Sequence, residues 1–272
     1  MTTFAISVFN AYNNTMNNAY RTPIDACFIN QKIQNPYQMM PLFESINSTS
    51  TYIKDTISEL NHGTIIIAKH QSMGRGRYER KFESNKDVGI YCSFLLKDQI
   101  TTNLLNLIHL KIVCALQYSI KQVFKVDTQI KWPNDLMINN RKCAGILIET
   151  NINMNTAKCD GLIIGFGLNI YKQNFTNSLK ENATTLEDHS TFDLDRNKLI
   201  VHFFNHLHEF LYHTDIIPYY KKYMLPINSW VNLTLYNKKE LVKIVDLDEY
   251  GQLIIQTKTN SLLTLFNDEI TL

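Results

Sequence analysis

The sequence predicts an α+β protein that ends in a small β-domain, and three patterns carry this prediction. Residues 103–124 and 199–213 repeat apolar side chains at the spacing of one helix face. Between them lie short strand-like segments, two of which are joined by an Asn139-Asn140 turn that is typical of a hairpin. After Pro226 several short strand-like segments follow closely, which indicates a small β-barrel or sandwich.

The segments before residue 103 fit the same plan. Residues 42–46 resemble a short strand, and the hydroxyl side chains at 48–50 can cap a helix whose apolar stripe is Ile53, Ile57 and Leu60. Residues 64–68 and 90–96 have the β-branched and aromatic composition of buried strands. We therefore expect an N-terminal extension of unknown role (1–40), a main domain (41–225) and a small C-terminal β-domain (226–272).

The composition excludes several classes of protein. The chain is 44% hydrophobic and 19% charged with a formal charge of +2, so bulk electrostatic binding of nucleic acid is not expected. It has no apolar run long enough to span a bilayer and no secretory signal. Its five cysteines form no C-x-x-C pair, which favours a reducing compartment and argues against a zinc site. We expect a cytoplasmic protein; an organellar leader has little support, because only Arg21 and Lys32 are basic among the first forty residues.

Glycine is scarce, with nine residues in 272, and several of them fall beside charged side chains. Gly74 and Gly76 lie in a basic loop with Arg75, Arg77 and Arg80. Glycine lets the backbone approach a ligand, and arginine matches phosphate or carboxylate oxygens. The loop therefore predicts an anionic ligand, although a solvated basic loop or a nucleic-acid patch would have the same composition.

Two further segments could carry chemistry. Residues 131–136 read Lys-Trp-Pro-Asn-Asp-Leu, and a predicted hairpin returns Lys142 near Asp135. This group could bind a nucleotide and its metal, or form an ordinary surface ion-pair cluster. Gly165 and Gly167 precede Asn169 at a strand end, where they could permit a close backbone approach or form a simple bulge.

One pair of histidines has the spacing of a zinc-binding motif but lacks the rest of it. His202 and His206 have the spacing of a zinc pair on a helix, with Glu209 nearby. The catalytic zinc motif needs glutamate directly after the first histidine, and Phe203 stands there instead. We interpret the histidines as polar residues of an amphipathic helix.

Five blocks, in this order and spacing, resemble the biotin protein ligases over residues 42–272. They are Ser48-Thr49 before a helix, Gln71-x-x-Gly-Arg-Gly-Arg-x-x-Arg80, Lys-Trp-Pro-Asn-Asp135, Lys142-x-x-Gly-Ile-Leu-x-Glu149 and Gly165-x-Gly-x-Asn169. The resemblance is to the form of the family without an N-terminal DNA-binding domain, since the first forty residues show no helix-turn-helix pattern.

The resemblance implies a fold and a reaction. The fold is a mixed, largely antiparallel sheet packed by helices, followed by a small C-terminal β-barrel, as in class II synthetase-like ligases. The reaction uses ATP, biotin and Mg²⁺ to make biotinyl-5′-AMP and pyrophosphate. Biotin then passes to a lysine of a biotin carboxyl carrier domain of a biotin-dependent carboxylase such as acetyl-CoA carboxylase. No specific DNA binding and no membrane partner are expected, and the protein could be a monomer or a homodimer.

The resemblance also implies roles for matching residues. Lys142 is the expected catalytic cation, and Arg75 and Arg77 belong to the catalytic loop that closes over the ligands. The implied biotin-binding residues are Ser48, Thr49, Gln71, Gly74, Arg75, Arg77, Lys142, Gly145 and Leu147. The implied ATP- and adenylate-binding residues are Arg77, Arg80, Phe82, Asn134, Asp135, Lys142 and Asn169, with Asp135 as a ligand of Mg²⁺.

Three positions depart from the family pattern. Ser50 replaces an asparagine, Glu79 a glycine and Phe82 a tryptophan. The nearest alternative function is a lipoate-type protein ligase, and an alternative from another class is a biotin-responsive DNA-binding repressor. A non-catalytic biotin-binding protein agrees poorly with an intact Lys142 and arginine loop.

Overall fold

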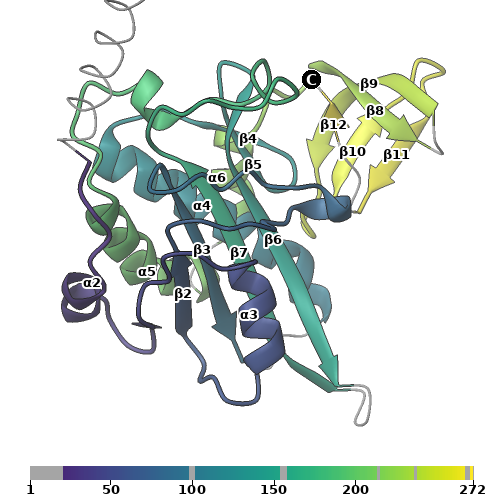
Figure 1. Ribbon diagram of the computed structural model, residues 1–272. Coiled ribbons are helices and arrows are strands. Elements are labelled where there is room, and N and C mark those ends of the chain that lie inside the picture. Colours follow the sequence, from purple (N-terminus) through teal and green to yellow (C-terminus); the bar gives the residue numbers. More distant parts are fainter. Residues whose placement is uncertain are drawn as a thin grey trace, which may run out of the picture.

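A seven-stranded mixed sheet forms the centre of the main domain (Figure 1). The computed structural model describes residues 21–97, 102–153, 158–212, 215–235, 238–266 and 270–271. In spatial order the strands are β1 (Gln38–Met39), β2 (Thr64–Ala68), β3 (Gly89–Leu96), β7 (Lys158–Asn169), β6 (Arg141–Asn153), β5 (Asp135–Ile138) and β4 (Gln129–Lys131). Only the β1–β2 pair is parallel among these strands. The expected mixed, largely antiparallel sheet is confirmed.

One face of this sheet is covered by two long helices, α4 (Thr102–Phe124) and α5 (Arg196–Tyr212) (Figure 1). They match the two predicted amphipathic segments closely. The sheet meets them with alternate residues of each central strand, which include Ile90, Cys92 and Phe94 of β3. Phe94 packs edge-on against Phe203 and Phe204 of α5. A third helix, α6 (Ile216–Tyr223), follows α5 and packs on α4.

The opposite face of the sheet is covered at one end by α3 (Thr49–Thr56). Ser48 caps this helix, because its Oγ accepts a hydrogen bond from the Thr51 N–H at 3.4 Å. The predicted stripe of Ile53, Ile57 and Leu60 is buried against Ile66, Leu95 and Ile163 of the sheet. The rest of this face is left for the cavity described below.

Residues 21–40 pack on the main domain. They form α2 (Ala26–Lys32), which lies beside α5, and the edge strand β1. Arg196, which is 1% exposed, donates hydrogen bonds to the Thr22 carbonyl (3.0 Å) and the Gly89 carbonyl (3.1 Å). Ile24, Ile29, Tyr37 and Met39 of this segment belong to the same hydrophobic core as the sheet. The boundary at residue 40 stays a prediction. Residues 1–20 lie outside the described residues. The predicted strand at 42–46 is not formed: the chain bends at residues 44 and 45, and Phe43 and Ile46 make isolated bridges to Ala68 and Gln71.

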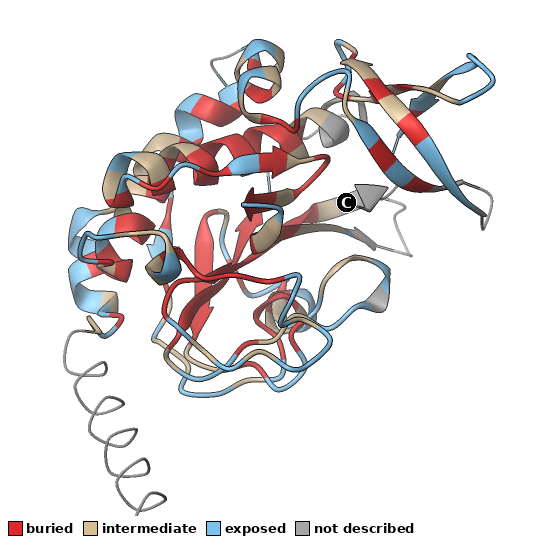
Figure 2. Cartoon of the chain, turned by 90° about the horizontal axis from the view of Figure 1, so that it is seen from above, coloured by how far each residue is buried: buried red, intermediate tan, exposed pale blue. Residues whose placement is uncertain are grey.

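The C-terminal part is a five-stranded antiparallel sheet that stands beside the main domain (Figure 1). Its order is β11 (Leu262–Leu265), β10 (Leu253–Gln256), β9 (Lys238–Leu247), β8 (Trp230–Leu235) and β12 (Ile270–Thr271). Buried and exposed residues alternate along these strands, as Figure 2 shows, so the sheet has one apolar face. No helix in the described part of the chain combines the length and the apolar character needed to cross a membrane.

The His202–His206 pair belongs to the packing of α4 against α5. The two rings are stacked at 4.0 Å and both contact Tyr118, while His202 Nδ1 lies 3.1 Å from Ser119 Oγ. Burial, with a smaller contribution from its neighbours His206 and Lys125, lowers the pKa of His202 to about 4. The ring is therefore neutral in the folded protein near neutral pH, and its neighbours are those of a helix–helix contact.

His202 should make folding sensitive to mild acid. Its pKa is lower in the folded state than in the unfolded chain, so stability is lost as the pH falls from about 6.5 toward about 4. We expect the melting temperature of His202→Gln to fall less over this range than that of the wild type. Calorimetry on both proteins, each referred to its own value at pH 8, measures the difference; equal losses would contradict the assignment.

Candidate active site

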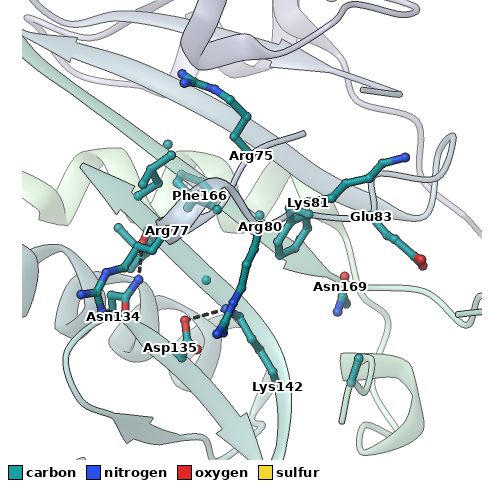
Figure 3. A pocket seen from close by; sticks show the side chains of 18 of the residues that line it. Arg75, Arg77, Arg80, Lys81, Glu83, Asn134, Asp135, Lys142, Phe166 and Asn169 are labelled. Carbon is teal, nitrogen blue, oxygen red and sulfur yellow. Dashed lines mark hydrogen bonds and ion pairs between the residues drawn. The ribbon is translucent and has the colours of Figure 1, made fainter. Parts of the chain in front are cut away.

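A cavity of about 610 Å³ opens on the sheet face that α4 and α5 do not cover (Figure 3). Strands β3, β6 and β7, the arginine loop and the corner before β5 line it, together with residues 175–183. Nearly all of the predicted site residues come together there: Thr49, Gln71, Arg75, Arg77, Arg80, Phe82, Asn134, Asp135, Lys142, Gly145, Leu147 and Asn169. Ser48 and Gly74 are the exceptions. They do not line the cavity, but they contact Ser50 and Phe82, which do.

The floor of the cavity follows from the alternation of side chains along a strand. Gly145 pairs with Gly167, and Leu147 pairs with Gly165, so three glycines and one leucine lie side by side on one face of β6 and β7. Further along the same face, Ile163 packs under α3. The change from isoleucine to glycine marks the point where helix packing ends and the cavity begins.

A network of buried hydroxyl and amide groups closes one end of the cavity. The Thr49 N–H donates to Gln71 Oε1 at 2.8 Å, and Thr49 Oγ1 lies 2.7 Å from Ser93 Oγ. Gln71 Nε2 donates to Ser84 Oγ at 2.9 Å. Ser48 Oγ lies 3.2 Å from the Oγ of Ser50, a second buried hydroxyl that lines the cavity. Such a network can offer both donors and acceptors to a polar ligand while remaining sheltered from water.

Gly74 shapes the loop beside this network. A Cβ at this position would lie 2.5 Å from the Phe82 carbonyl oxygen and 2.7 Å from Ser84 Oγ. The Phe82 N–H also donates to the Gly74 carbonyl at 2.9 Å. The two ends of the arginine loop are therefore in contact at this glycine, which explains its place in the motif although it does not line the cavity.

Lys142 and Asp135 form an ion pair in the cavity, with Nζ 2.7 Å from Oδ1 (Figure 3). The Lys142 backbone is fixed from the other side, where its N–H donates to the Asn182 carbonyl and its carbonyl accepts from the Thr184 N–H. A Cβ on Gly145 would lie 2.7 Å from Lys142 Nζ. Gly145 therefore provides the space that the lysine side chain occupies.

The arginines of the loop point in different directions. Arg77 donates from Nη1 to Asn134 Oδ1 at 3.3 Å and stacks on Tyr78 with its guanidinium carbon 5.0 Å from the ring centre. Arg75 donates instead to Glu149 Oε2 at 2.7 Å on β6, and Figure 3 shows it directed away from the Asp135–Lys142 pair. Tyr78 has a positive φ of 53°, an unusual conformation for a tyrosine. The side chain of Glu79 lies outside the described residues.

The other end of the cavity is apolar. The Phe82 ring lies directly over Gly167, where an added Cβ would be 2.4 Å from the ring. Phe175, Leu179 and Ala183 line the same cavity from a segment that carries none of the predicted site residues. Asn169 ties that segment to β7, because its Nδ2 donates to the Thr184 carbonyl at 3.2 Å.

Sequence reasoning also missed Ser50, Ser93 and Trp132, all of which line the cavity. Ser93 could have been found, because it is a polar residue inside a predicted buried strand and is 1% exposed. No group of three or more metal-ligating side chains occurs in the described residues. In that part of the chain two carboxylates line the cavity, Asp135 and Glu83, and Asp135 is the one paired with Lys142. One carboxylate suffices for Mg²⁺ where phosphate oxygens and water complete the shell.

Comparison with known proteins agrees with this geometry. A sequence-family model described as the Biotin/lipoate A/B protein ligase family matches residues 42–169. The bifunctional ligase/repressor BirA of Bacillus spizizenii is 30% identical over 202 residues, which are 72% of this chain and 62% of that protein. The biotin protein ligase of Aquifex aeolicus, solved with biotin and ATP, superposes with a TM-score of 0.70 at 26% identity, covering 86% of this chain and 97% of that one.

The chain contains a domain of the biotin/lipoate A/B protein ligase family. A further relative is the biotin--[acetyl-CoA-carboxylase] ligase of Mycobacterium tuberculosis, which is 24% identical over 76% of this chain and 79% of that protein. The chain spans 62% of the length of the Bacillus protein.

Two of the three departures from the ligase pattern are visible in the site. Ser50 is 6% exposed, and its Oγ lies 3.6 Å from the point where a Cβ on Gly165 would stand. Phe82 retains an aromatic face on the cavity and contacts Tyr91 with ring centres 6.4 Å apart. Both departures keep the chemical character of the surface around them, polar at Ser50 and aromatic at Phe82.

Gly145→Ala should separate the Lys142 ammonium from Asp135. The new methyl group would stand 2.7 Å from Nζ, and a flexible lysine side chain moves more easily than the paired strands β5 and β6. We expect a folded variant whose Nζ–Oδ1 distance exceeds hydrogen-bond range, which a crystal structure of the variant would measure. Persistence of the ion pair beside alanine would contradict this account of Gly145.

Proposed function

We propose that this chain is an ATP-dependent biotin protein ligase. One observation carries the proposal: a single cavity joins the buried polar network of Thr49, Gln71 and Ser93 to the Asp135–Lys142 pair and the arginine loop. The polar network suits the ureido head of biotin, which has N–H donors and a carbonyl acceptor. The glycine floor suits its carbon chain, and the cations suit its carboxylate and the phosphates of ATP.

The first step of the proposed reaction joins two anions. A carboxylate oxygen of biotin attacks the α-phosphorus of ATP, the bond from phosphorus to the bridging oxygen breaks, and pyrophosphate leaves. Lys142 offsets the repulsion between carboxylate and phosphate and stabilises the charge on the phosphoryl oxygens. Asp135 holds the lysine ammonium in place at 2.7 Å and is the residue that would hold Mg²⁺ with the phosphates.

The remaining groups bind and shelter the adenylate. Arg77 and Arg80 line the cavity as further cations for the phosphates, and Phe82 offers a stacking face for adenine beside Gly167. Arg75, Arg77 and their loop exclude water from the mixed anhydride, which water would otherwise hydrolyse. In the second step a lysine amine of a biotin carboxyl carrier domain attacks the acyl carbon, and AMP leaves as biotin forms an amide.

The buried polar network favours biotin over lipoate. The dithiolane ring of lipoate has no N–H donor and no carbonyl, so Thr49, Gln71 and Ser93 would lose hydrogen bonds to water without replacement. A polar site rejects a ligand that leaves its buried groups unpaired more strongly than an apolar site rejects a ligand of the wrong size. We therefore expect clear discrimination between the two acids.

The test is to incubate the protein with MgATP, an apo carrier domain and either biotin or lipoate. Covalent label on the carrier, detected by mass spectrometry, is expected with biotin and not with lipoate. Labelling by lipoate at an equal rate would favour the alternative ligase. Absence of both transfer and biotin-dependent exchange of pyrophosphate into ATP would overturn the proposal.

Lys142→Ala should lose most adenylate formation while remaining folded. Removing one charge-stabilising group costs roughly 100- to 1,000-fold in rate. Lys198→Ala is the matched control, because Lys198 has a side chain that is 65% exposed and lies on α5 outside the cavity. Biotin-dependent pyrophosphate exchange measures both variants, and a rate for Lys142→Ala within threefold of the control would refute the assigned role.

A further inference from the structure

The C-terminal sheet reaches the site corner through one buried hydrogen bond. Trp132, which is 2% exposed, donates from its indole Nε1 to the Gly251 carbonyl at 3.0 Å. Gly251 lies in the turn between β9 and β10, whereas Trp132 directly precedes Pro133, Asn134 and Asp135 and itself lines the cavity. We infer that the β9–β10 turn is a positioning element for the nucleotide end of the site, acting through Trp132.

The turn is built to hold this carbonyl in one place. Asp248 Oδ1 accepts hydrogen bonds from the Tyr250 N–H (2.9 Å) and the Gln252 N–H (2.8 Å), and the Gly251 N–H donates to the Asp248 carbonyl at 3.1 Å. Gly251 has a φ of +79°, which favours glycine, and a Cβ there would lie 2.5 Å from Leu110 Cδ1 of α4. The turn is thus rigid in itself and seated against the main domain.

The corner that receives this contact is held from two other directions. Tyr220 of α6 donates from its hydroxyl to the Pro133 carbonyl at 3.3 Å. Asn134 bonds reciprocally with Ile146 of β6, whose N–H donates to the Asn134 carbonyl at 3.0 Å. The hydrogen bond from Trp132 to Gly251 connects this corner to the C-terminal sheet. An ion pair between Lys221 Nζ of α6 and Asp246 Oδ1 of β9, at 2.6 Å, also connects the main domain to that sheet.

Asn134 and Asp135 come directly after Pro133, and they contact two cations that bind the phosphates in the proposed function, on which this inference rests. Asn134 accepts from Arg77, and Asp135 holds Lys142. A shift of Trp132 would move both. The polar end of the cavity is instead fixed by α3, β3 and the hydrogen bonds between Thr49, Gln71 and Ser93. Loosening the turn should therefore weaken ATP binding and spare biotin binding.

Two variants of the full chain test this division. Trp132→Phe keeps an aromatic ring and removes the indole donor, and Asp248→Ala loosens the turn from a position outside the cavity. We expect the KM for MgATP to rise about five- to tenfold in both, the size of effect that one net hydrogen bond has, with the Kd for biotin within twofold of wild type. Trp230→Phe is the matched control: it removes the chain's other tryptophan, which is 52% exposed on β8, and should change neither constant.

A second readout does not depend on catalysis. In the Trp230→Phe background Trp132 is the one tryptophan of the chain, so Asp248→Ala should shift its fluorescence to longer wavelength and speed amide exchange at residues 134–136 but not at 49–53. If the wild type forms no biotinyl-AMP, the proposed function fails, and fluorescence and exchange still decide the positioning claim. An unchanged KM with unchanged exchange would overturn the inference, as would parallel loss of ATP and biotin binding.

Discussion

The cavity depends on one constraint, the alternation of side chains along β3, β6 and β7. One set of alternate residues must pack on α4 and α5, so the other set faces away from them. On that second face the residues are large and apolar under α3, and then become Ser93, Gly145, Gly165 and Gly167. These small residues leave space over the sheet, which Lys142 fills above Gly145 and Phe82 above Gly167, so both side chains lie close to the backbone at the cavity. Every group proposed to bind a ligand stands around this strip of small residues.

The same strip of small residues also sets where the Lys142 ammonium group lies. The Lys142 side chain occupies space that any residue larger than Gly145 would take, and it meets Asp135 across the β5–β6 hairpin. The phenyl ring of Phe82 similarly depends on Gly167. Scarce glycine in this chain is thus used where a neighbouring side chain needs its volume. Packing and electrostatics are consequently coupled, since the position of the cation is set by the absence of a methyl group.

The corner at residues 132–135 joins three parts of the molecule. A helix and the C-terminal sheet each contribute one hydrogen bond to it, from Tyr220 and to Gly251, and strand β6 contributes a reciprocal pair through Ile146. Short polar segments are not rigid by themselves, so a site on such a segment needs outside support to hold its geometry. This arrangement gives the C-terminal sheet a physical connection to the site, although its own strands do not line the cavity.

The sequence by itself determined the local features of this protein. Helix periodicity located α4 and α5 to within a few residues, and the hairpin, the arginine loop and the glycine pairs were visible because each depends on neighbours in the chain. The five motifs were enough to predict site residues of which all but Ser48 and Gly74 line the cavity. The folded structure decided what depends on residues distant in sequence: the packing of α2 and β1 on the core, the wall at 175–183, the Arg75–Glu149 pair and the Trp132–Gly251 bond. These contacts have no local pattern, because their partners are brought together only when the sheet forms.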